Sequence, residues 1–169
     1  MVSLLRSFHA RTCKIVFRNG GTLDKFLGDG FMVTFGTLVD DRDSARKALA
    51  CAFELQDEME RWAAKRATRA EPPIVVAMGV HYGPVVVGNV GAEQRLEFTV
   101  VGDTVNVASR LERLTREHAC RIALSKDALE AAGGLGAFGR PVEARGPITL
   151  RGRHEPVELY TWPAAAPSH

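Results

Sequence analysis

Cysteine is scarce in this chain, with three residues in 169, at positions 13, 51 and 120. An odd number without CxxC spacing excludes a disulfide framework and a zinc-binding motif, and it predicts free thiols in a reducing compartment. Long apolar runs are also absent, since stretches such as 74–78 and 84–87 are far too short to cross a bilayer. The N-terminus has no secretory signal with a small-residue cleavage site. We therefore expect a cytoplasmic domain without a membrane segment, alone or within a larger protein.

An excess of one charge is missing as well, because 22 basic residues balance 20 acidic ones to leave a net charge of +2. This balance gives no indication of a nucleic-acid or membrane partner. Several catalytic motifs are also absent, namely the P-loop, the glycine-rich dinucleotide fingerprint, HExxH and GxSxG. None of the five histidines lies at metal-ligand spacing from another, and His81, inside a strand-like run, is interpreted as structural.

Hydrophobic residues make up 46% of the chain and charged residues 25%, which is typical of one soluble globular domain. Apolar periodicity predicts a helix over 2–18, a long helix begun by Asp40 and Asp41, a third helix capped by Asp103, and a short one capped by Ser125. Strand-like runs cover 22–27, 31–35, 74–80, 85–90, 96–101, 120–124, 148–151 and 157–162. Because hairpins separate many of these runs, we expect an α+β fold with a mostly antiparallel sheet, ending in a frayed tail at 164–169.

The segment 20–30 places Asp29 at a hairpin tip between two glycines, where a phosphate or a metal ion can approach the backbone closely. Mg²⁺ prefers carboxylate oxygen and takes its remaining ligands from water and substrate phosphates. The simpler interpretation is a tight type I′ Asp-Gly turn, which backbone geometry alone favours. Lys25, in the preceding apolar run, is either an edge-strand lysine or a donor to a buried acceptor. From these residues alone, both pairs of alternatives stay open.

The segment 98–110 carries Asn106 and Arg110, four residues apart on one face of the helix that starts at Asp103. An amide and a guanidinium near a helix N-terminus suit a phosphate-rich ligand in both geometry and field. The alternative is a solvated polar stripe, because Arg113 and Glu117 continue the same face.

In combination, the two segments resemble the class III nucleotidyl cyclases. The motifs are a Gly-Gly-x-x-x-Lys-Phe-x-Gly-Asp hairpin and, downstream, Val-Gly-Asp-Thr-Val-Asn-x-Ala-Ser-Arg-Leu, with further matches at 35–36, 79–83, 88–91 and 150–153. The resemblance implies a catalytic domain over 1–163 with a ferredoxin-like core that acts as a head-to-tail homodimer. It also implies conversion of ATP to cyclic AMP and pyrophosphate by attack of the 3′-hydroxyl on the α-phosphate, assisted by two Mg²⁺ or Mn²⁺ ions at the dimer interface.

The same resemblance assigns roles to individual residues. Lys25 and Thr99 would read the base; guanylyl cyclases typically carry an acid and a small Cys- or Ser-like residue at these positions, so lysine with threonine implies the ATP-using type. Asn106 would orient the ribose, and Arg110 would stabilise charge on the α-phosphate. Arg151, where the family commonly has lysine, would hold the terminal phosphates.

Asp29 would be one of two metal-binding aspartates. In the family the other lies on a first strand, in a Phe-x-Asp-x-x-Gly-Phe-Thr-like segment that has no counterpart in this sequence. We therefore expect an N-terminally truncated sheet, an open strand edge and a metal site with a single carboxylate. The alternative function is a non-catalytic nucleotide-binding or dimerisation module, derived from a cyclase and inactive because this aspartate is absent. A generic α+β interaction domain without nucleotide is a third alternative.

Overall fold

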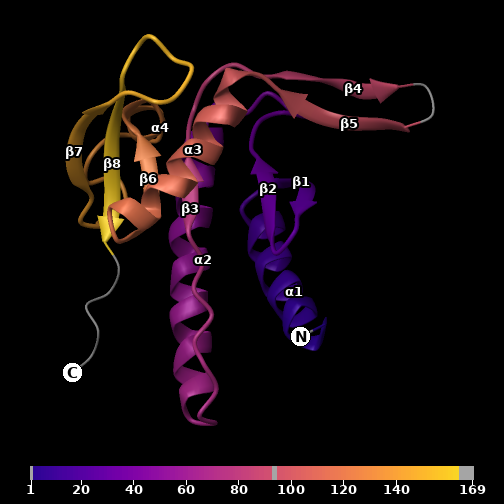
Figure 1. Ribbon diagram of the computed structural model, residues 1–169, viewed down its shortest axis with the longest axis vertical. Coiled ribbons are helices and arrows are strands. Elements are labelled where there is room, and N and C mark those ends of the chain that lie inside the picture. Colours follow the sequence, from indigo (N-terminus) through magenta and orange to yellow (C-terminus); the bar gives the residue numbers. More distant parts are fainter. Residues whose placement is uncertain (1, 93–94, 164–169) are drawn as a thin grey trace.

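The computed structural model describes residues 2–92 and 95–163 (Figure 1). In chain order its elements are α1 (Val2–Arg18), β1 (Thr22–Leu27), β2 (Gly30–Thr34), α2 (Ser44–Ala67), β3 (Met78–Val80), β4 (Val86–Ala92), β5 (Arg95–Val101), α3 (Asp103–Glu117), β6 (Cys120–Ser125), α4 (Lys126–Ala131), β7 (Glu143–Ile148) and β8 (Val157–Pro163). No helix in the described part of the chain is both long enough and apolar enough to cross a membrane. The predicted tail at 164–169 lies outside the described residues.

The strands form three sheets. β1 and β2 make an antiparallel hairpin, and β4 and β5 make a second hairpin that projects from the body of the molecule (Figure 1). The third sheet has the order β3-β6-β8-β7, in which β3 runs parallel to β6 and the other neighbours are antiparallel. The predicted α+β class with mostly antiparallel pairing is confirmed.

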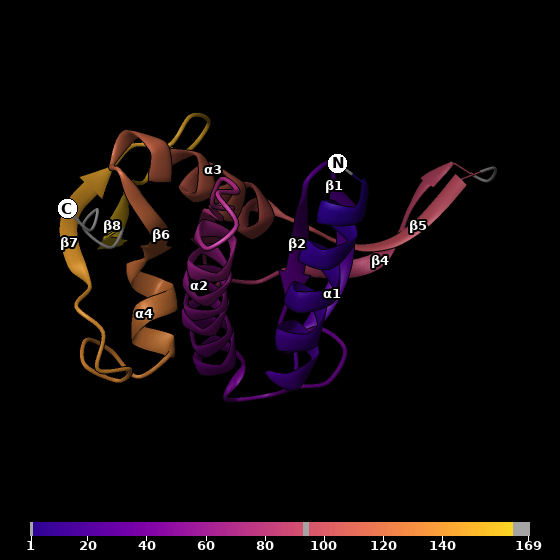
Figure 2. The same cartoon turned by 90° about the horizontal axis from the view of Figure 1, so that it is seen from below.

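Helix α2 is the central support of the fold, with the α1–β1–β2 unit on one side and the four-stranded sheet on the other (Figure 2). The large apolar side chains along this helix are buried, as their spacing predicts. Leu49 and Phe53 belong to a core cluster with Trp162 of β8. Cys51 and Leu55, on another side of the helix, pack against Ile15 of α1. Because α2 contacts both neighbours, it joins the two parts into one domain.

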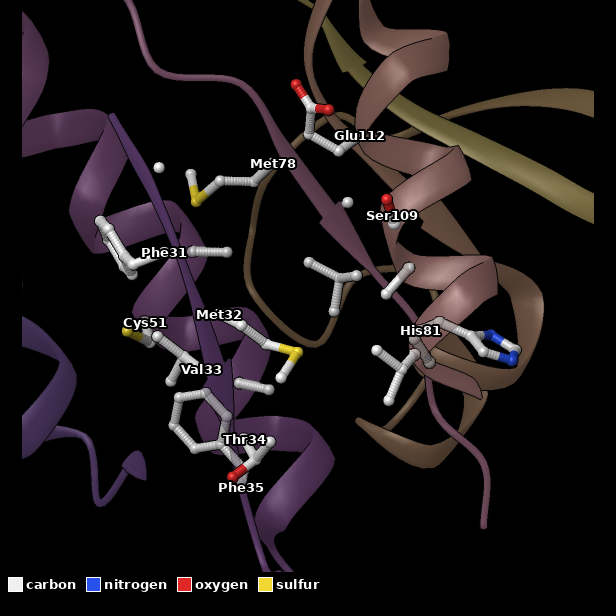
Figure 3. Close-up of a pocket in the computed structure, with 18 of the residues that line it drawn as sticks. Phe31, Met32, Val33, Thr34, Phe35, Cys51, Met78, His81, Ser109 and Glu112 are labelled. Carbon is white, nitrogen blue, oxygen red and sulfur yellow. The ribbon is translucent and has the colours of Figure 1, made fainter. Parts of the chain in front are cut away.

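A groove separates the β1–β2 hairpin from the four-stranded sheet. Among the described residues, β2 pairs only with β1 and β3 pairs only with β6, so each strand leaves one edge unpaired. Figure 3 shows side chains of β2, including Met32 and Val33, on one side of this groove, and Met78, Ser109 and Glu112 on the other. The groove belongs to a cavity of about 2010 Å³. The open strand edges that the resemblance predicts are therefore present.

One predicted helix cap is confirmed and another is wrong. The side chain of Ser125 accepts a hydrogen bond from the backbone of α4, as expected. The long helix begins at Ser44, with Asp43 and not Asp40 or Asp41 at its N-cap position. The Asp41 carboxylate instead accepts hydrogen bonds from the Asp43 amide at 2.9 Å and from Lys47 at 2.5 Å, so it stabilises the turn that precedes the helix.

The connection from β7 to β8 also departs from the prediction of a strand over 148–151. β7 ends at Ile148, and the Arg153 amide donates to the Leu150 carbonyl at 3.0 Å, which closes a turn. Leu150 is buried beside α3. Asp103 is the first residue of α3 rather than its cap, and its carboxylate lies 3.3 Å from Arg153 Nε. Tertiary contacts therefore hold this turn against the N-terminal half of α3.

Candidate active site

Strand β1 carries a β-bulge at the position of the predicted base-reading lysine. Leu23 pairs with Val33 and Lys25 pairs with Met32, so Asp24 is an extra residue without a partner on β2. A bulge interrupts the alternation of side chains along a strand and commonly re-aims one of them. Here Asp24 and Lys25, although consecutive in sequence, both reach side chains of β5.

Asp24, Lys25, Glu97 and Thr99 form a polar group between these strands, which we name the β1–β5 cluster. The Thr99 hydroxyl donates a hydrogen bond of 2.6 Å to Asp24 Oδ2. Lys25 Nζ lies 3.1 Å from Glu97 Oε1 and 3.8 Å from Asp24 Oδ2. Thr99 is 5% exposed, and the side chains of Asp24 and Lys25 are 8% and 24% exposed. Lys25 therefore lies on an edge strand, with the exposed Glu97 as its nearest partner and the buried Asp24 carboxylate beside it.

Asn106 and Arg110 lie on α3, which follows β5 through Gly102. The φ of Gly102 is +143°, a conformation that side chains with a Cβ atom rarely adopt, so glycine permits this abrupt passage from strand to helix. Asn106 is exposed and Arg110 is half-buried. A Cβ atom placed on Gly152 would lie 3.7 Å from Arg110 Nη2, so this guanidinium lies beside the turn that carries Arg151.

The turn with Arg151 is anchored to α3 by a buried side chain. Leu150 is 5% exposed and belongs to an apolar cluster with Leu111 of α3, whereas Arg151 itself is exposed. We name Asn106, Arg110 and Arg151 the α3 cluster. Arg110, at the middle of α3, and Arg151, in the adjoining turn, bring two guanidinium groups to neighbouring elements, which suits an anionic ligand.

Asp29 lies at the tip of the β1–β2 hairpin, in a two-residue loop with Gly28. A positive φ at Gly28, +66°, without one at Asp29 is typical of a type II′ turn and not of the type I′ turn given as the simpler interpretation. Asp29 is exposed. The described residues contain no group of three or more His, Cys, Asp or Glu side chains placed to hold a metal ion. Asp29 is thus available to a cation but is not part of such a group.

The other titratable side chains of interest are structural. His81 Nδ1 forms a hydrogen bond of 2.7 Å with Ser125 Oγ, and burial lowers the pKa of this histidine. Burial raises the pKa of Cys51 to about 12 and also raises the pKa of Cys120. Neither of these thiols is a nucleophile near neutral pH, because the thiolate is the reactive form.

The structure brings the predicted site residues together in two clusters and leaves one apart. Lys25 and Thr99 lie in the β1–β5 cluster, whereas Asn106, Arg110 and Arg151 lie along α3 and its attached turn. Asp29 occupies the hairpin tip. Sequence reasoning missed Asp24, since an acid beside a lysine in a hairpin resembles an exposed pair. Its burial depends on the bulge and on β5, neither of which local sequence reveals.

Comparison with known proteins identifies the family. The sequence profile of the adenylate and guanylate cyclase catalytic domain matches residues 1–162. This chain belongs to that family. An uncharacterized protein of Mycobacterium tuberculosis is 38% identical over 161 residues, or 94% of the chain, and an adenylate cyclase of Anabaena cylindrica is 30% identical over 160 residues, or 92%. The cyclase chain spans only 27% and 31% of the lengths of these relatives.

Solved cyclase structures share the fold. The guanylyl cyclase Cya2 has a TM-score of 0.78 at 30% identity, with 98% of this chain and 82% of that chain covered. The adenylyl cyclase CyaB from P. aeruginosa has a TM-score of 0.82 at 26% identity, with 98% and 83% covered. The nucleotide-cyclase fold implied by the resemblance is therefore confirmed. Because these neighbours include a guanylyl and an adenylyl cyclase, the fold alone does not distinguish the two purines.

Proposed function

We propose that this chain is an adenylate cyclase domain, which converts ATP into cyclic AMP and pyrophosphate. The observation that carries the proposal is the placement of Lys25 and Thr99 together in the β1–β5 cluster of a cyclase-family chain. In the reaction, the ribose 3′-oxygen forms a bond to the α-phosphorus. The bond between the α-phosphorus and the oxygen of the β-phosphate breaks, pyrophosphate leaves, and the hydroxyl proton passes to solvent.

The β1–β5 cluster suits adenine better than guanine. Adenine offers a donor at its 6-amino group and an acceptor at N1, whereas guanine offers an acceptor at O6 and a donor at N1. The Lys25 ammonium has donors only, so it matches N1 of adenine, and the Thr99 hydroxyl can accept from the amino group. Guanine would place its N1 donor against the Lys25 donors. Base contacts of this kind typically discriminate by about 1–3 kcal/mol.

The α3 cluster suits the sugar and the triphosphate. Asn106 would orient the ribose, and Arg110 would offset the charge that develops on the α-phosphate in the transition state. Arg151 would hold the terminal phosphates and can do so with two parallel donors. The proximity of Arg110 to the Arg151 turn supports these roles.

Divalent metal ions, two Mg²⁺ or Mn²⁺ per complete site, are part of the proposal. When bound, such ions activate the attacking hydroxyl and clamp the triphosphate. Among the described residues, Asp29 supplies one exposed carboxylate, which fits one hard cation but not a pair of them. A pair of ions would therefore need ligands in addition to Asp29, and substrate phosphates and water can supply some of them.

We further propose that two copies of the chain form a head-to-tail homodimer with two sites. In each site Asp29 would come from one copy, whereas the β1–β5 and α3 clusters would come from the other. The exposed position of Asp29 at a hairpin tip supports this arrangement, because the carboxylate is accessible to a second copy.

The direct test is the formation of cyclic AMP from ATP with Mn²⁺ by the 169-residue chain, beside its Lys25→Ala and Asp29→Ala variants. Turnover that is lost in both variants supports the adenylate cyclase. Lys126→Ala, which removes an exposed lysine on α4, is the matched control and is expected to keep activity. Turnover unchanged in Lys25→Ala or in Asp29→Ala contradicts the proposed site.

The single exposed carboxylate also favours a second candidate function, that of a non-catalytic nucleotide-binding or dimerisation module. Such a module would bind ATP without turnover. Metal content measured with a bound ATP analogue separates the two candidates: two ions per site favour the enzyme, and one or none favours the module.

A further inference from the structure

One residue of the β1–β5 cluster has no role in the proposed reaction so far. Asp24 is the extra residue of the β-bulge, its side chain is 8% exposed, and its Oδ2 accepts the Thr99 hydroxyl at 2.6 Å. Burying a carboxylate costs free energy unless it is well partnered, and the bulge interrupts the β1–β2 ladder. A plain hairpin would avoid both costs.

We propose that Asp24 is a positioning residue that sets the purine preference, an inference that rests on the proposed function. A carboxylate only accepts hydrogen bonds, so the single hydroxyl proton of Thr99 is committed to Asp24. The hydroxyl then presents only lone pairs to a base. A group that can only accept selects the 6-amino donor of adenine and rejects the O6 acceptor of guanine.

The bulge also allows Asp24 to affect the purine preference through Lys25. Asp24 Oδ2 lies 3.8 Å from Lys25 Nζ, so the carboxylate attracts the ammonium toward the threonine that it orients. Without Asp24, the Thr99 hydroxyl can rotate, and it can donate to O6 of guanine as readily as it accepts from adenine. Loss of Asp24 is therefore expected to weaken discrimination between purines more than it weakens nucleotide binding as a whole.

The test measures purine preference by binding rather than by turnover. The nucleotides 3′-deoxy-ATP and 3′-deoxy-GTP lack the attacking hydroxyl and cannot be cyclised. Titration calorimetry on the full chain gives the ratio of the Kd for the GTP analogue to that for the ATP analogue. We expect Asp24→Ala to lower this ratio about tenfold.

Two matched variants isolate the orientation of the hydroxyl from charge and volume. Glu130→Gln removes an exposed carboxylate on α4, outside both clusters, so the ratio is expected to stay at the wild-type value. Thr99→Ser keeps a hydroxyl and is also expected to keep the ratio. Asp24→Leu, which has a similar shape but no acceptor, replaces Asp24→Ala if that variant does not fold, and it should lower the ratio because the Thr99 hydroxyl is then free to donate.

A double-mutant cycle shows whether Asp24 acts through Thr99. In a Thr99→Val background, Asp24→Ala is expected to change the ratio no further. A change of equal size in both backgrounds overturns the inference, and so does an Asp24→Ala variant with the wild-type ratio. A merely structural role would lower the unfolding temperature and leave the ratio unchanged.

The wild-type chain distinguishes failure of this inference from failure of the proposed function. A preference for the ATP analogue that survives Asp24→Ala overturns the role of Asp24 and leaves the adenylate cyclase proposal in place. Equal affinity for the two analogues, a preference for the GTP analogue, or no binding of either overturns both.

Discussion

The two clusters of the candidate site differ in how many of their polar side chains already have partners within the chain. In the β1–β5 cluster the polar side chains have partners within the chain, with Thr99 bonded to Asp24 at 2.6 Å and Lys25 lying 3.1 Å from Glu97. In the α3 cluster the side chains are exposed or half-buried, and the backbone and a buried leucine hold them in place. One end of the site is organised before a ligand arrives, whereas the other remains open to solvent.

The chemistry of the expected ligand explains this difference. Reading a neutral base requires donors and acceptors whose directions are fixed in advance, because a free hydroxyl accepts and donates equally well. A triphosphate brings several negative charges, so arginines that are correctly placed can adjust around it and gain most of their interaction on binding. Under the proposed function, the base end would therefore provide selectivity and the phosphate end would provide transition-state stabilisation.

The largest expected effect comes from disrupting the α3 cluster. Arg110→Ala removes the charge that offsets the transition state, and kcat for cyclic AMP formation should fall about 10²–10³-fold. The purine preference in binding should stay unchanged. Arg113→Ala, which removes an exposed arginine on the same helix, is the control and should retain activity. Near-normal kcat in Arg110→Ala would place the reacting phosphate elsewhere.

Mixing two inactive variants tests whether Asp29 and the β1–β5 cluster come from different copies of the chain. Lys25→Ala and Asp29→Ala should each be inactive alone. After mixing, random dimers should recover about a quarter of the wild-type activity, since about half are mixed and each mixed dimer has one intact site. Lys25→Ala mixed with Thr99→Val should recover nothing, because both defects affect the same cluster. If the first mixture recovers no activity, the proposal that two copies share each site is wrong.

Leu150, which anchors the Arg151 turn, allows a test of whether a change in the α3 cluster affects the β1–β5 cluster. Leu150→Ala should lower the free energy of unfolding by about 2–5 kcal/mol, because it leaves a cavity beside α3. It should also raise KM for ATP while the purine ratio stays constant. Urea denaturation and steady-state kinetics measure these quantities, with Leu135→Ala, at a position 65% exposed, as the control. A shifted purine ratio would show that the clusters are coupled.

The smallest effect concerns His81, which belongs to neither cluster. Burial, the main cause, holds the pKa of His81 below its usual 6.5 in the folded chain, so the unfolded chain binds a proton more readily. Stability should therefore rise with pH through this range and fall as the solution is acidified below about 6.5. His81→Gln should flatten this slope in denaturation curves, and the exposed His154→Gln should not. An unchanged slope in His81→Gln would contradict its assignment.

Elements governed by local signals could be predicted from the sequence. Helix α1 ends before Gly20 as expected, and the strands flanking Asp29 form the expected hairpin. Features decided by tertiary contacts could not be predicted. Asp41 binds Lys47 instead of capping α2. Leu150, which the sequence places in a strand, lies in a turn after β7 and packs against α3. Apolar periodicity predicts which face of a segment is buried. It does not reveal which residues from other parts of the chain will contact a given side chain.

The same distinction applies to the candidate site. Lys25, Thr99 and Asn106 were identified through the order and spacing of motifs, because those relations are visible along the chain. Asp24 was not, since its burial depends on a register shift between two strands and on a third strand distant in sequence. A residue such as Asp24, which contacts another residue of the site, has no sequence motif of its own. It is recognised only once the pairing of the strands is known.

The groove between β2 and β3 has a consequence for cooperativity. No backbone ladder crosses it in the described structure, so the α1–β1–β2 unit is joined to the rest by side-chain packing on α2 and on the segment 74–78, and by contacts between β1 and β5. Such a unit can open without breaking the four-stranded sheet, and its amide hydrogens should exchange at a lower free energy than those of β6 and β8. Because Lys25 is on β1 and Thr99 on β5, a bound purine would bridge the two strands. Nucleotide would then act on the N-terminal unit as a folding ligand that slows its exchange.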